Sequence, residues 1–235
     1  MRLPARQRGF TLVEMAIVLA LFGLLVGGTL VVVGAQQEQQ RIRTTEQTLR
    51  KASEALLGYA LATTPDSDPA YLPCPADPAI GPTDPNYGRE DRDPDDNSCA
   101  REDGWLPWVT LGLGERDGWG QRVWYRVERD WSNPEGSPVG SAPGIGFDTA
   151  SSLSILDRDA NNNSCTGPVR AAEGVPVVLR SAGGSRALDP ANTAAASGAP
   201  RDEFCTGPRV AGFDDLVQWV SPHLLRARLL AAGRL

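Results

Sequence analysis

The sequence has very little histidine and no motif of a known catalytic type. His223 is the only histidine among 235 residues, and its context, "SPHLLRARLL", is typical of a surface position or a helix start. The chain lacks a GxSxG nucleophile elbow, a phosphate-binding P-loop and an HExxH zinc motif. Its many carboxylates fall in loops rich in proline and asparagine, where solvated turns are expected rather than a buried acid–base pair. We therefore expect that the protein is not an enzyme.

Charge is also missing from one long stretch near the N-terminus. No charged residue occurs between Met15 and Ala35, and Thr29 is the only conventional polar side chain there. About 20 mostly apolar residues in a helix are enough to cross a bilayer. The pattern therefore predicts a transmembrane helix over residues 10–35. Glu14 lies near its start, where a carboxylate in lipid needs a partner or a function.

The first nine residues, "MRLPARQRG", contain three arginines and no acidic residue. Basic residues before a span favour a cytoplasmic N-terminus, so the chain after residue 35 is expected on the outer side of the membrane. A secretory signal peptide also begins with basic residues, but its apolar core is shorter than this one. We therefore expect a single-pass membrane anchor, with the C-terminal domain on the outer side of the membrane.

Cysteines are few, and none of them forms a CxxC pair. The four are Cys74, Cys99, Cys165 and Cys205, all on the side expected to be outside the membrane. An even number of cysteines in an oxidising compartment suggests two disulfides, although four cysteines allow three pairings. We favour Cys74 with Cys99 and Cys165 with Cys205. Zinc is disfavoured because CxxC spacing is absent and the single histidine is distant.

The net charge is the next constraint on possible partners. The formal charge is −6, and it becomes more negative when the three basic residues of the leader are left out. Proteins that bind nucleic acid through its backbone need a basic face. We therefore expect no nucleic-acid partner.

The N-terminal sequence "GFTLVEMAIVLALFGLLVGG" resembles the signal of type IV prepilins and of type II secretion pseudopilins. The resemblance implies that residues 1–9 are a leader, which a prepilin peptidase removes after Gly9. It also implies that the same membrane enzyme methylates the new amino group of Phe10. In this family, Glu14 is expected to pair with the N-terminal amine of a neighbouring subunit. The alternative is that Glu14 is solvated at headgroup depth and stabilised by the helix dipole.

Beyond the span, residues 36–61 keep a helical stripe of Ile42, Leu49 and Leu56, with Ala52 and Tyr59 between them. We expect one long helix whose periplasmic half lies on a sheet. Residues 64–100 are too rich in proline for regular structure and predict a long loop. The expected fold is α+β: a long N-terminal helix packed on a small antiparallel sheet, with disulfide-tied loops in a pilin-like domain over residues 62–235.

Two further segments resemble the major pseudopilins. In "DGWGQRVWYRV", a turn precedes a strand, and Asp117, Trp119, Gly120 and Tyr125 match that family's pattern. "VPVVLRSAGG" and "DDLVQWV" look like its last strands. The tryptophans near the turn are expected in the core; the alternative is an exposed aromatic patch for a partner.

An internal repeat suggests a possible calcium site. "DRDPDDNSC" (91–99) and "DRDANNNSC" (157–165) are identical at six of nine positions. Oxygen-bearing side chains at alternate positions are typical of the first half of a calcium loop. The candidate ligands are Asp91, Asp93, Asp95 and Asn97 in the first copy, and Asp157, Asp159, Asn161 and Asn163 in the second. Neither copy has the glycine and distal glutamate of an EF-hand, so asparagine- and aspartate-rich turns are the alternative.

The resemblance also implies a calcium site in the loop before the last strands of major pseudopilins. The corresponding segment here, residues 181–205, has lost the compact Asp-Gly pattern and is longer. We therefore expect the Cys165–Cys205 disulfide to take the metal's place, which favours a minor or specialised subunit.

These features together predict a structural subunit, a minor pseudopilin or minor pilin, of a type II secretion pseudopilus or a type IV pilus. Its expected partners are the prepilin peptidase, other pilin or pseudopilin subunits and the inner-membrane assembly platform. The alternative is a binding or adhesion module at the filament tip that contacts a secreted substrate or a surface.

Overall fold

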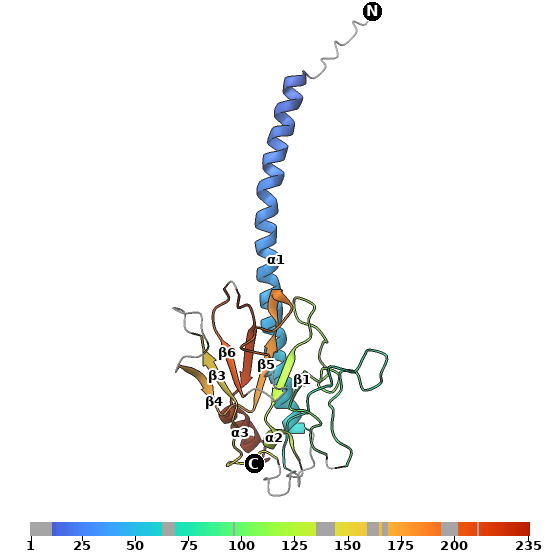
Figure 1. Cartoon of the computed structure of the whole chain (residues 1–235), viewed down its shortest axis with the longest axis vertical. Helices are drawn as coiled ribbons and strands as arrows, with labels where there is room; N and C mark the ends of the chain where they lie inside the picture. Colours follow the sequence, from blue (N-terminus) through green and yellow to red (C-terminus); the bar gives the residue numbers. More distant parts are fainter. Residues whose placement is uncertain are drawn as a thin grey trace, which may run out of the picture. The chain divides into compact units, whose positions relative to one another are not determined.

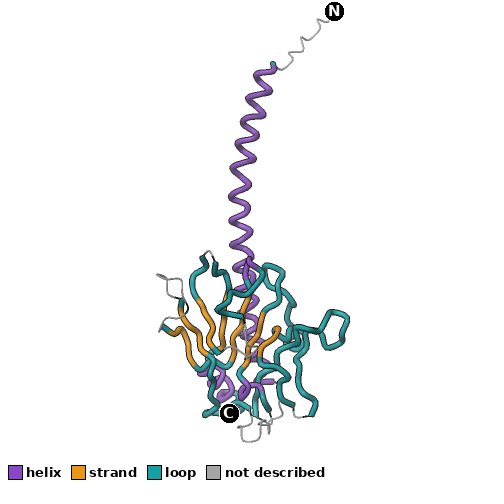
Figure 2. The backbone as a smooth tube through the Cα atoms, in the orientation of Figure 1, coloured by secondary structure: helices purple, strands orange, loops and turns teal. Residues whose placement is uncertain are grey.

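The computed structural model describes residues 11–62, 69–95, 97–134, 144–158, 165, 169–193, 202–210 and 212–235, with residues 25–33 described as backbone only. The chain divides into two compact units, residues 1–41 and 42–235. Figure 1 shows the order of the elements, and Figure 2 shows that loops make up much of the second unit.

The first unit consists of the N-terminal part of helix α1, which runs over 51 residues from Leu12 to Ala62. Apolar side chains between Leu12 and Leu24 are exposed. In the described part of the chain, no helix has the length and hydropathy needed to cross a membrane. The span predicted over residues 10–35 includes Phe10 and the side chains of residues 25–33, which lie outside the described residues.

The C-terminal part of α1 belongs to the second unit and packs into its main core. Leu49, Ala52, Leu56 and Ala60 are buried, at intervals of three or four residues that place them on one helix face. This burial confirms the helical stripe predicted from the sequence.

The main sheet has four strands in the order β1-β2-β5-β7, and all its neighbours are antiparallel. The strands are β1 (Asp103–Trp105), β2 (Trp124–Val127), β5 (Val177–Ser181) and β7 (Leu216–Val220). Tyr125 and Leu179 face each other across β2 and β5 and belong to the α1 core. Helix α3 (Pro222–Ala231) adds Leu225 and Leu229, and the short α2 (Arg129–Ser132) adds Trp131.

A second sheet has three strands, β3 (Ser154–Asp157), β4 (Arg170–Glu173) and β6 (Glu203–Thr206), in the order β4-β3-β6. Ile155 and Phe204 from this sheet form a smaller core with Val178 of β5. Because Val178 alternates with the residues that face α1, this core lies on the opposite face of the main sheet. The second unit therefore contains three layers: helix α1, the main sheet and the three-stranded sheet.

The α+β fold class is confirmed. The prediction of one small antiparallel sheet, however, accounts for only part of the strands. The structure has a second sheet, and β3 pairs with β6 in parallel. A parallel pair needs a long crossover, and the chain between these strands passes through β4, β5 and the 3₁₀ helix η1 (Gly183–Ser185). Short strands with weak alternation, such as "RAAE" in β4, do not predict this pairing.

The described part of the proline-rich segment, residues 69–95 and 97–100, contains turns and isolated bridges but no helix or strand. Leu72, Cys74 and Ala76 are nevertheless buried. This segment is a long ordered loop, as its proline content predicts.

Candidate functional site

The predicted cleavage position, Gly9 and Phe10, lies outside the described residues, which begin at Thr11. Thr11 and Glu14 form a capping box at the start of α1. The Thr11 backbone N–H donates to Glu14 Oε2 at 3.3 Å, and the Glu14 N–H donates to Thr11 Oγ1 at 3.2 Å. Such reciprocal bonds satisfy two backbone donors that the helix leaves without partners. The Glu14 carboxylate therefore has a partner within its own chain, and the T-x-x-E spacing of "TLVE" was the sequence signal for it.

The structure joins Cys74 to Cys99 and Cys165 to Cys205, the two pairs favoured by the sequence analysis. The first disulfide ties the proline-rich loop back to the start of β1. The second connects the segment before β4 to β6 of the three-stranded sheet.

The carboxylates of the first repeat, here called the acidic loop (residues 91–97), point to different partners. Asp91 forms an ion pair with Arg101 at 3.1 Å, and Arg101 also pairs with Asp77 at 2.8 Å. Asp93 Oδ1 accepts from the backbone N–H of Asp95 at 2.8 Å, which is an Asx turn. Among the described residues, these aspartates do not gather into a group of three acidic ligands.

Asn97 of this loop has a positive φ of 57°, a backbone conformation that asparagine tolerates. In the second repeat, Asp157 is exposed at the end of β3. The other predicted ligands there, Asp159, Asn161 and Asn163, lie outside the described residues. Calcium in either repeat stays a prediction.

An arginine that sequence reasoning missed organises the acidic loop. Arg92 donates to the carbonyl oxygens of Leu72, Asn97 and Ser132, each at 3.0 Å, and pairs with Glu90 at 2.8 Å. Its guanidinium also lies 4.6 Å from the centre of the Tyr71 ring. The loop is therefore built around a largely buried cation. The matching arginine of the second repeat, Arg158, is also buried and stacks on Phe213.

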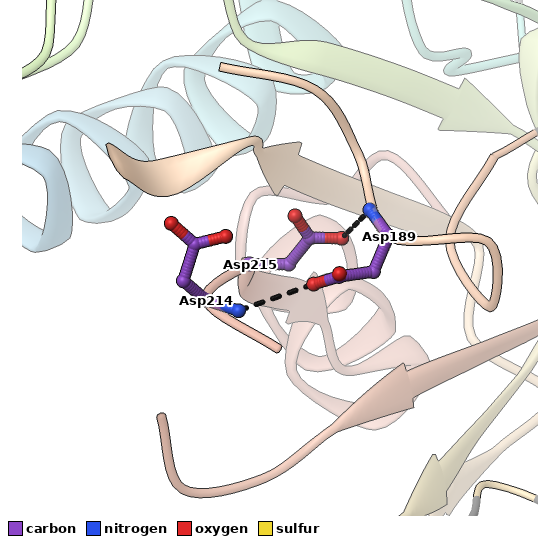
Figure 3. A group of neighbouring side chains, drawn as sticks. All are labelled: Asp189, Asp214 and Asp215. Atoms are coloured by element: carbon purple, nitrogen blue, oxygen red, sulfur yellow. Dashed lines mark hydrogen bonds between the residues drawn. The ribbon is translucent and has the colours of Figure 1, made fainter. Parts of the chain in front are cut away.

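A different group of carboxylates, here called the acidic cluster, meets at the end of the main sheet. It comprises Asp189, from the loop after η1, and Asp214 and Asp215, which directly precede β7. One carboxylate oxygen from each lies within 4.8 Å of the other two. Figure 3 shows the three side chains and the two hydrogen bonds that join their segments. Among the described residues, none of the three takes part in an ion pair.

Asp215 is the most unusual member of the acidic cluster because only 3% of it is exposed. Its Oδ2 accepts from the backbone N–H of Asp189 at 3.0 Å and from Asn192 Nδ2 at 2.9 Å. Its Oδ1 is buried and has no hydrogen-bond partner among the described residues. Burial, and to a lesser extent the negative charges of Asp189 and Asp214, raise the pKa of Asp215 to about 7, although the hydrogen bonds from Asn192 and Asp189 act in the opposite direction.

The acidic cluster has the chemistry of a hard-cation site. Carboxylate oxygens are the ligands that Ca²⁺ and Mg²⁺ prefer. A cation would supply the missing partner of Asp215 Oδ1 and relieve the repulsion among the three carboxylates. The residues present therefore fit a divalent cation.

One member of the acidic cluster, Asp189, lies in the segment where the pseudopilin resemblance implies calcium, and Asp214 and Asp215 follow that segment directly before β7. The cluster is also close to the second disulfide, because Asn192 Nδ2 donates both to Asp215 Oδ2 and to the carbonyl oxygen of Cys205. The disulfide and the carboxylates therefore lie close together, and replacement of the metal by the disulfide stays a prediction. The only sequence signal for the cluster was the Asp-Asp pair at the head of "DDLVQWV".

The turn that resembles major pseudopilins is tied to both the helix and the sheet. Asp117 Oδ1 accepts from the backbone N–H groups of Trp119 and Gln121, and Asp117 Oδ2 accepts from the Ser181 hydroxyl. The Gly118 N–H donates to Thr45 Oγ1 of α1 at 2.9 Å. Of the four tryptophans expected in the core, Trp108 and Trp119 are buried, whereas Trp105 and Trp124 are half-buried.

Comparison with known proteins finds one family model that matches part of the chain. Residues 4–30 match the family described as "Prokaryotic N-terminal methylation motif". No curated protein and no solved structure matches the chain. The motif is read by a prepilin peptidase and implies a precursor anchored in the inner membrane and then assembled into a pilus-like filament. Proteins that carry it are typically structural rather than enzymatic. The N-terminal segment thus carries the prepilin-type cleavage and methylation motif, which occurs in type IV pilins and pseudopilins.

Proposed function

We propose that the protein is a structural subunit, a minor pseudopilin or minor pilin, of a type II secretion pseudopilus or a type IV pilus. The observation that carries this proposal is the methylation motif at residues 4–30, followed by a helix that continues without a break to Ala62. Burial of the C-terminal part of that helix in the domain core supports a pilin-like design.

The proposed division is a leader (1–9), a transmembrane helix (10–35), the periplasmic part of the helix (36–61) and a globular domain (62–235). Three arginines before the helix favour a cytoplasmic N-terminus. The two disulfides are in keeping with a periplasmic globular domain. The subunit would await assembly in the inner membrane and contact the assembly platform and other subunits.

Processing at Gly9 is the direct test of this proposal. In cells that contain a prepilin peptidase, the mature chain should begin at Phe10 and carry one methyl group on its amine. Intact-mass spectrometry of the membrane fraction measures both changes. Gly9→Leu should block cleavage because the side chain is bulky, while Gly9→Ala should still be cut. A full-length wild-type N-terminus in such cells would contradict the proposal.

Glu14 is proposed to act in assembly by meeting the N-terminal amine of a neighbouring subunit. Within a single chain, Thr11 holds the Glu14 carboxylate through the capping box. On assembly, Glu14 would give up these contacts and form an ion pair with the amine of the neighbouring subunit. Glu14→Val should be cleaved and inserted normally but should enter cross-linked filaments poorly. Glu14→Gln keeps much of the capping geometry without the charge. If Glu14→Gln assembles as well as wild type, the capping role alone is sufficient.

A divalent cation, with calcium as first choice, is proposed at the acidic cluster. The buried oxygen of Asp215 supports this choice, since it has no partner in the described structure. The cation would fix the loop after η1 against the start of β7. Its role would be structural, as for the calcium expected in major pseudopilins.

The second candidate is a binding module at the filament tip. It is favoured by the aromatic group of Tyr87, Trp105 and Trp108, whose rings contact one another beside Arg122. Stoichiometry separates the two candidates, because a shaft subunit is present in many copies per filament and a tip module in few. Quantitative mass spectrometry of sheared filaments measures this ratio.

A further inference from the structure

A small pocket lies between the main sheet and the loop that follows η1. Its volume is about 220 Å³. One wall is formed by Asp103, Trp124 and Arg180 of strands β1, β2 and β5, and the other by Arg186, Ala187 and Leu188 of the loop. Trp124 and Arg180 are paired across the sheet and alternate with residues that face α1. The pocket therefore opens on the face of the main sheet away from that helix.

Arg180 forms the inner end of the pocket and is fully buried. Its Nη2 pairs with Asp103, and its Nη1 donates to the carbonyl oxygen of Asn192 at 2.6 Å. Its Nε is buried and has no acceptor in the part of the chain that the structure describes. Burial lowers the pKa of Arg180, whereas the Asp103 charge raises it. A buried guanidinium with an unused donor favours a further acceptor nearby.

Arg186 supplies a second positive charge at the mouth of the pocket. It is exposed, its backbone has a φ of 65°, and it forms no ion pair within the described part of the chain. The only carboxylate among the lining residues, Asp103, is already engaged by Arg180. Among the lining residues, two arginine charges face one carboxylate, so the lining itself favours an anionic ligand. The Asp215 charge also acts on Arg180 from outside the lining, which leaves Arg186 as the main source of unpaired positive charge.

The remaining walls set the size and polarity of that ligand. The Trp124 ring, Ala187 and Leu188 provide an apolar surface. The volume is below the roughly 300–1,000 Å³ typical of small-molecule sites. It suits an anion with one short apolar group.

We propose that this pocket binds a carboxylate attached to a branched aliphatic group, with the carboxylate toward Arg180 and Arg186 and the aliphatic group against Trp124. Two sources share this chemistry: the C-terminal residue of a peptide and a free short-chain carboxylic acid. The proposal goes beyond the structural role proposed above and does not depend on it.

The test is a titration of the full-length chain in lipid nanodiscs. Isothermal titration calorimetry and the indole N–H signal of Trp124 in NMR spectra detect the binding. Three probes are compared: N-acetyl-L-leucine, 4-methylpentanoate and N-acetyl-L-leucinamide. Trp124→Phe assigns the indole signal. The two carboxylates should bind saturably and shift that signal, and the uncharged amide should bind at least about tenfold more weakly, as expected for loss of a charge-assisted contact. Tighter binding of N-acetyl-L-leucine indicates a peptide terminus, whereas tighter binding of 4-methylpentanoate indicates a free acid.

Two variants and one control complete the test. Arg186→Gln should weaken carboxylate binding about five- to tenfold. Ala187→Leu, at an exposed loop position, should fill the pocket and abolish binding without unfolding the domain. Arg228→Gln removes an equally exposed arginine from α3, outside the pocket, and should bind like wild type. Equal affinity for acid and amide, an unaffected Arg186→Gln variant, or no binding of either carboxylate would overturn the proposal.

Discussion

The two acid-rich regions of the globular unit differ in what surrounds their carboxylates. In the acidic loop, Asp93 and Asp95 are exposed, and Asp91 is neutralised by Arg101. In the acidic cluster, Asp215 is buried, and no member forms an ion pair within the described structure. The acidic loop has more aspartates close together in sequence, yet the acidic cluster has the unsatisfied negative charge.

This difference shows that a cation site depends on burial and on the lack of competing partners more than on local aspartate density. Arg92 and Arg101 supply positive charge to the acidic loop from within the protein. Among the described residues, no cation forms an ion pair with the acidic cluster, although the Arg180 charge acts on Asp215 from a greater distance. A buried carboxylate without a paired counter-charge is costly. We therefore expect the first region to be stable without metal and the second to respond to it.

The largest effect is expected from Arg92→Met. The substitution removes three bonds to backbone carbonyl oxygens and leaves Glu90 without its ion-pair partner. Loss of one partner of a buried pair costs about 3–5 kcal/mol of unfolding free energy. Urea unfolding of the full chain in detergent micelles, followed by near-ultraviolet circular dichroism, measures the loss.

The matched control is Arg89→Met, since Arg89 is exposed and has one bond, to the Pro85 carbonyl oxygen. It should change the free energy by less than about 0.5 kcal/mol. The Arg92→Met loss should be the same with calcium and with chelator. A loss that appears only after chelation would mean that the acidic loop also depends on metal.

The next effect is the response of the acidic cluster to calcium. At a concentration of about 100 times its dissociation constant, a cation that binds only the folded state adds about 2.7 kcal/mol. Asp215→Asn should remove this gain, because the buried charged ligand is lost. Without calcium, the variant should be at least as stable as wild type, because repulsion with Asp189 and Asp214 is relieved. Differential scanning calorimetry with and without chelator measures both changes.

Asp93→Asn is the control for that experiment. It removes one charge from the acidic loop and keeps an oxygen for the turn to Asp95. Its calcium response should match that of wild type. If Asp93→Asn loses the response and Asp215→Asn keeps it, the assignment of the cation to the acidic cluster is wrong.

A smaller loss is expected from Gly183→Ala, which tests the close packing beside the acidic cluster. Gly183 has a φ of 57°, and an added Cβ would lie 2.3 Å from the carbonyl oxygen of Asp214. The strained backbone and the contact together should cost about 2 kcal/mol and weaken calcium binding. Gly212→Ala has a φ of 84° but no heavy atom within 4 Å of its added Cβ, so it separates backbone strain from the contact. Equal effects of the two variants on calcium affinity would argue against close packing as the cause.

Much of the fold was predictable because it depends on local patterns. The spacing of Leu49, Ala52 and Leu56 predicts which face of α1 is buried, and alternation in "QRVWYRV" predicts β2. The three-stranded sheet was missed because its strands are four residues long and β3 pairs with a strand from a distant part of the sequence. Alternation of apolar and polar residues indicates a strand, but it does not say which distant strand pairs with it.

The candidate sites also divide into those that a local sequence pattern predicts and those that form only when distant segments pack together. The N-terminal motif and Glu14 are readable because they are contiguous in sequence. The acidic cluster joins Asp189 to a pair of residues near position 215, and Arg92 acts through carbonyl oxygens that no residue type identifies. Burial of Asp215, which gives the cluster its chemistry, depends on how three distant segments pack.

The smallest effect is expected from Asp91→Asn in the acidic loop. The ion pair with Arg101 is partly exposed, with 30% and 32% of the two side chains accessible, and Arg101 keeps its second partner, Asp77. A pair of this kind contributes about 0–1 kcal/mol, and salt should reduce that contribution further. Urea unfolding at low and high salt measures it, and the response to calcium should be unchanged. If Asp91→Asn loses a substantial part of the calcium response, the cation binds in the acidic loop, as the repeat in the sequence suggested. The contrast between the two regions would then be wrong.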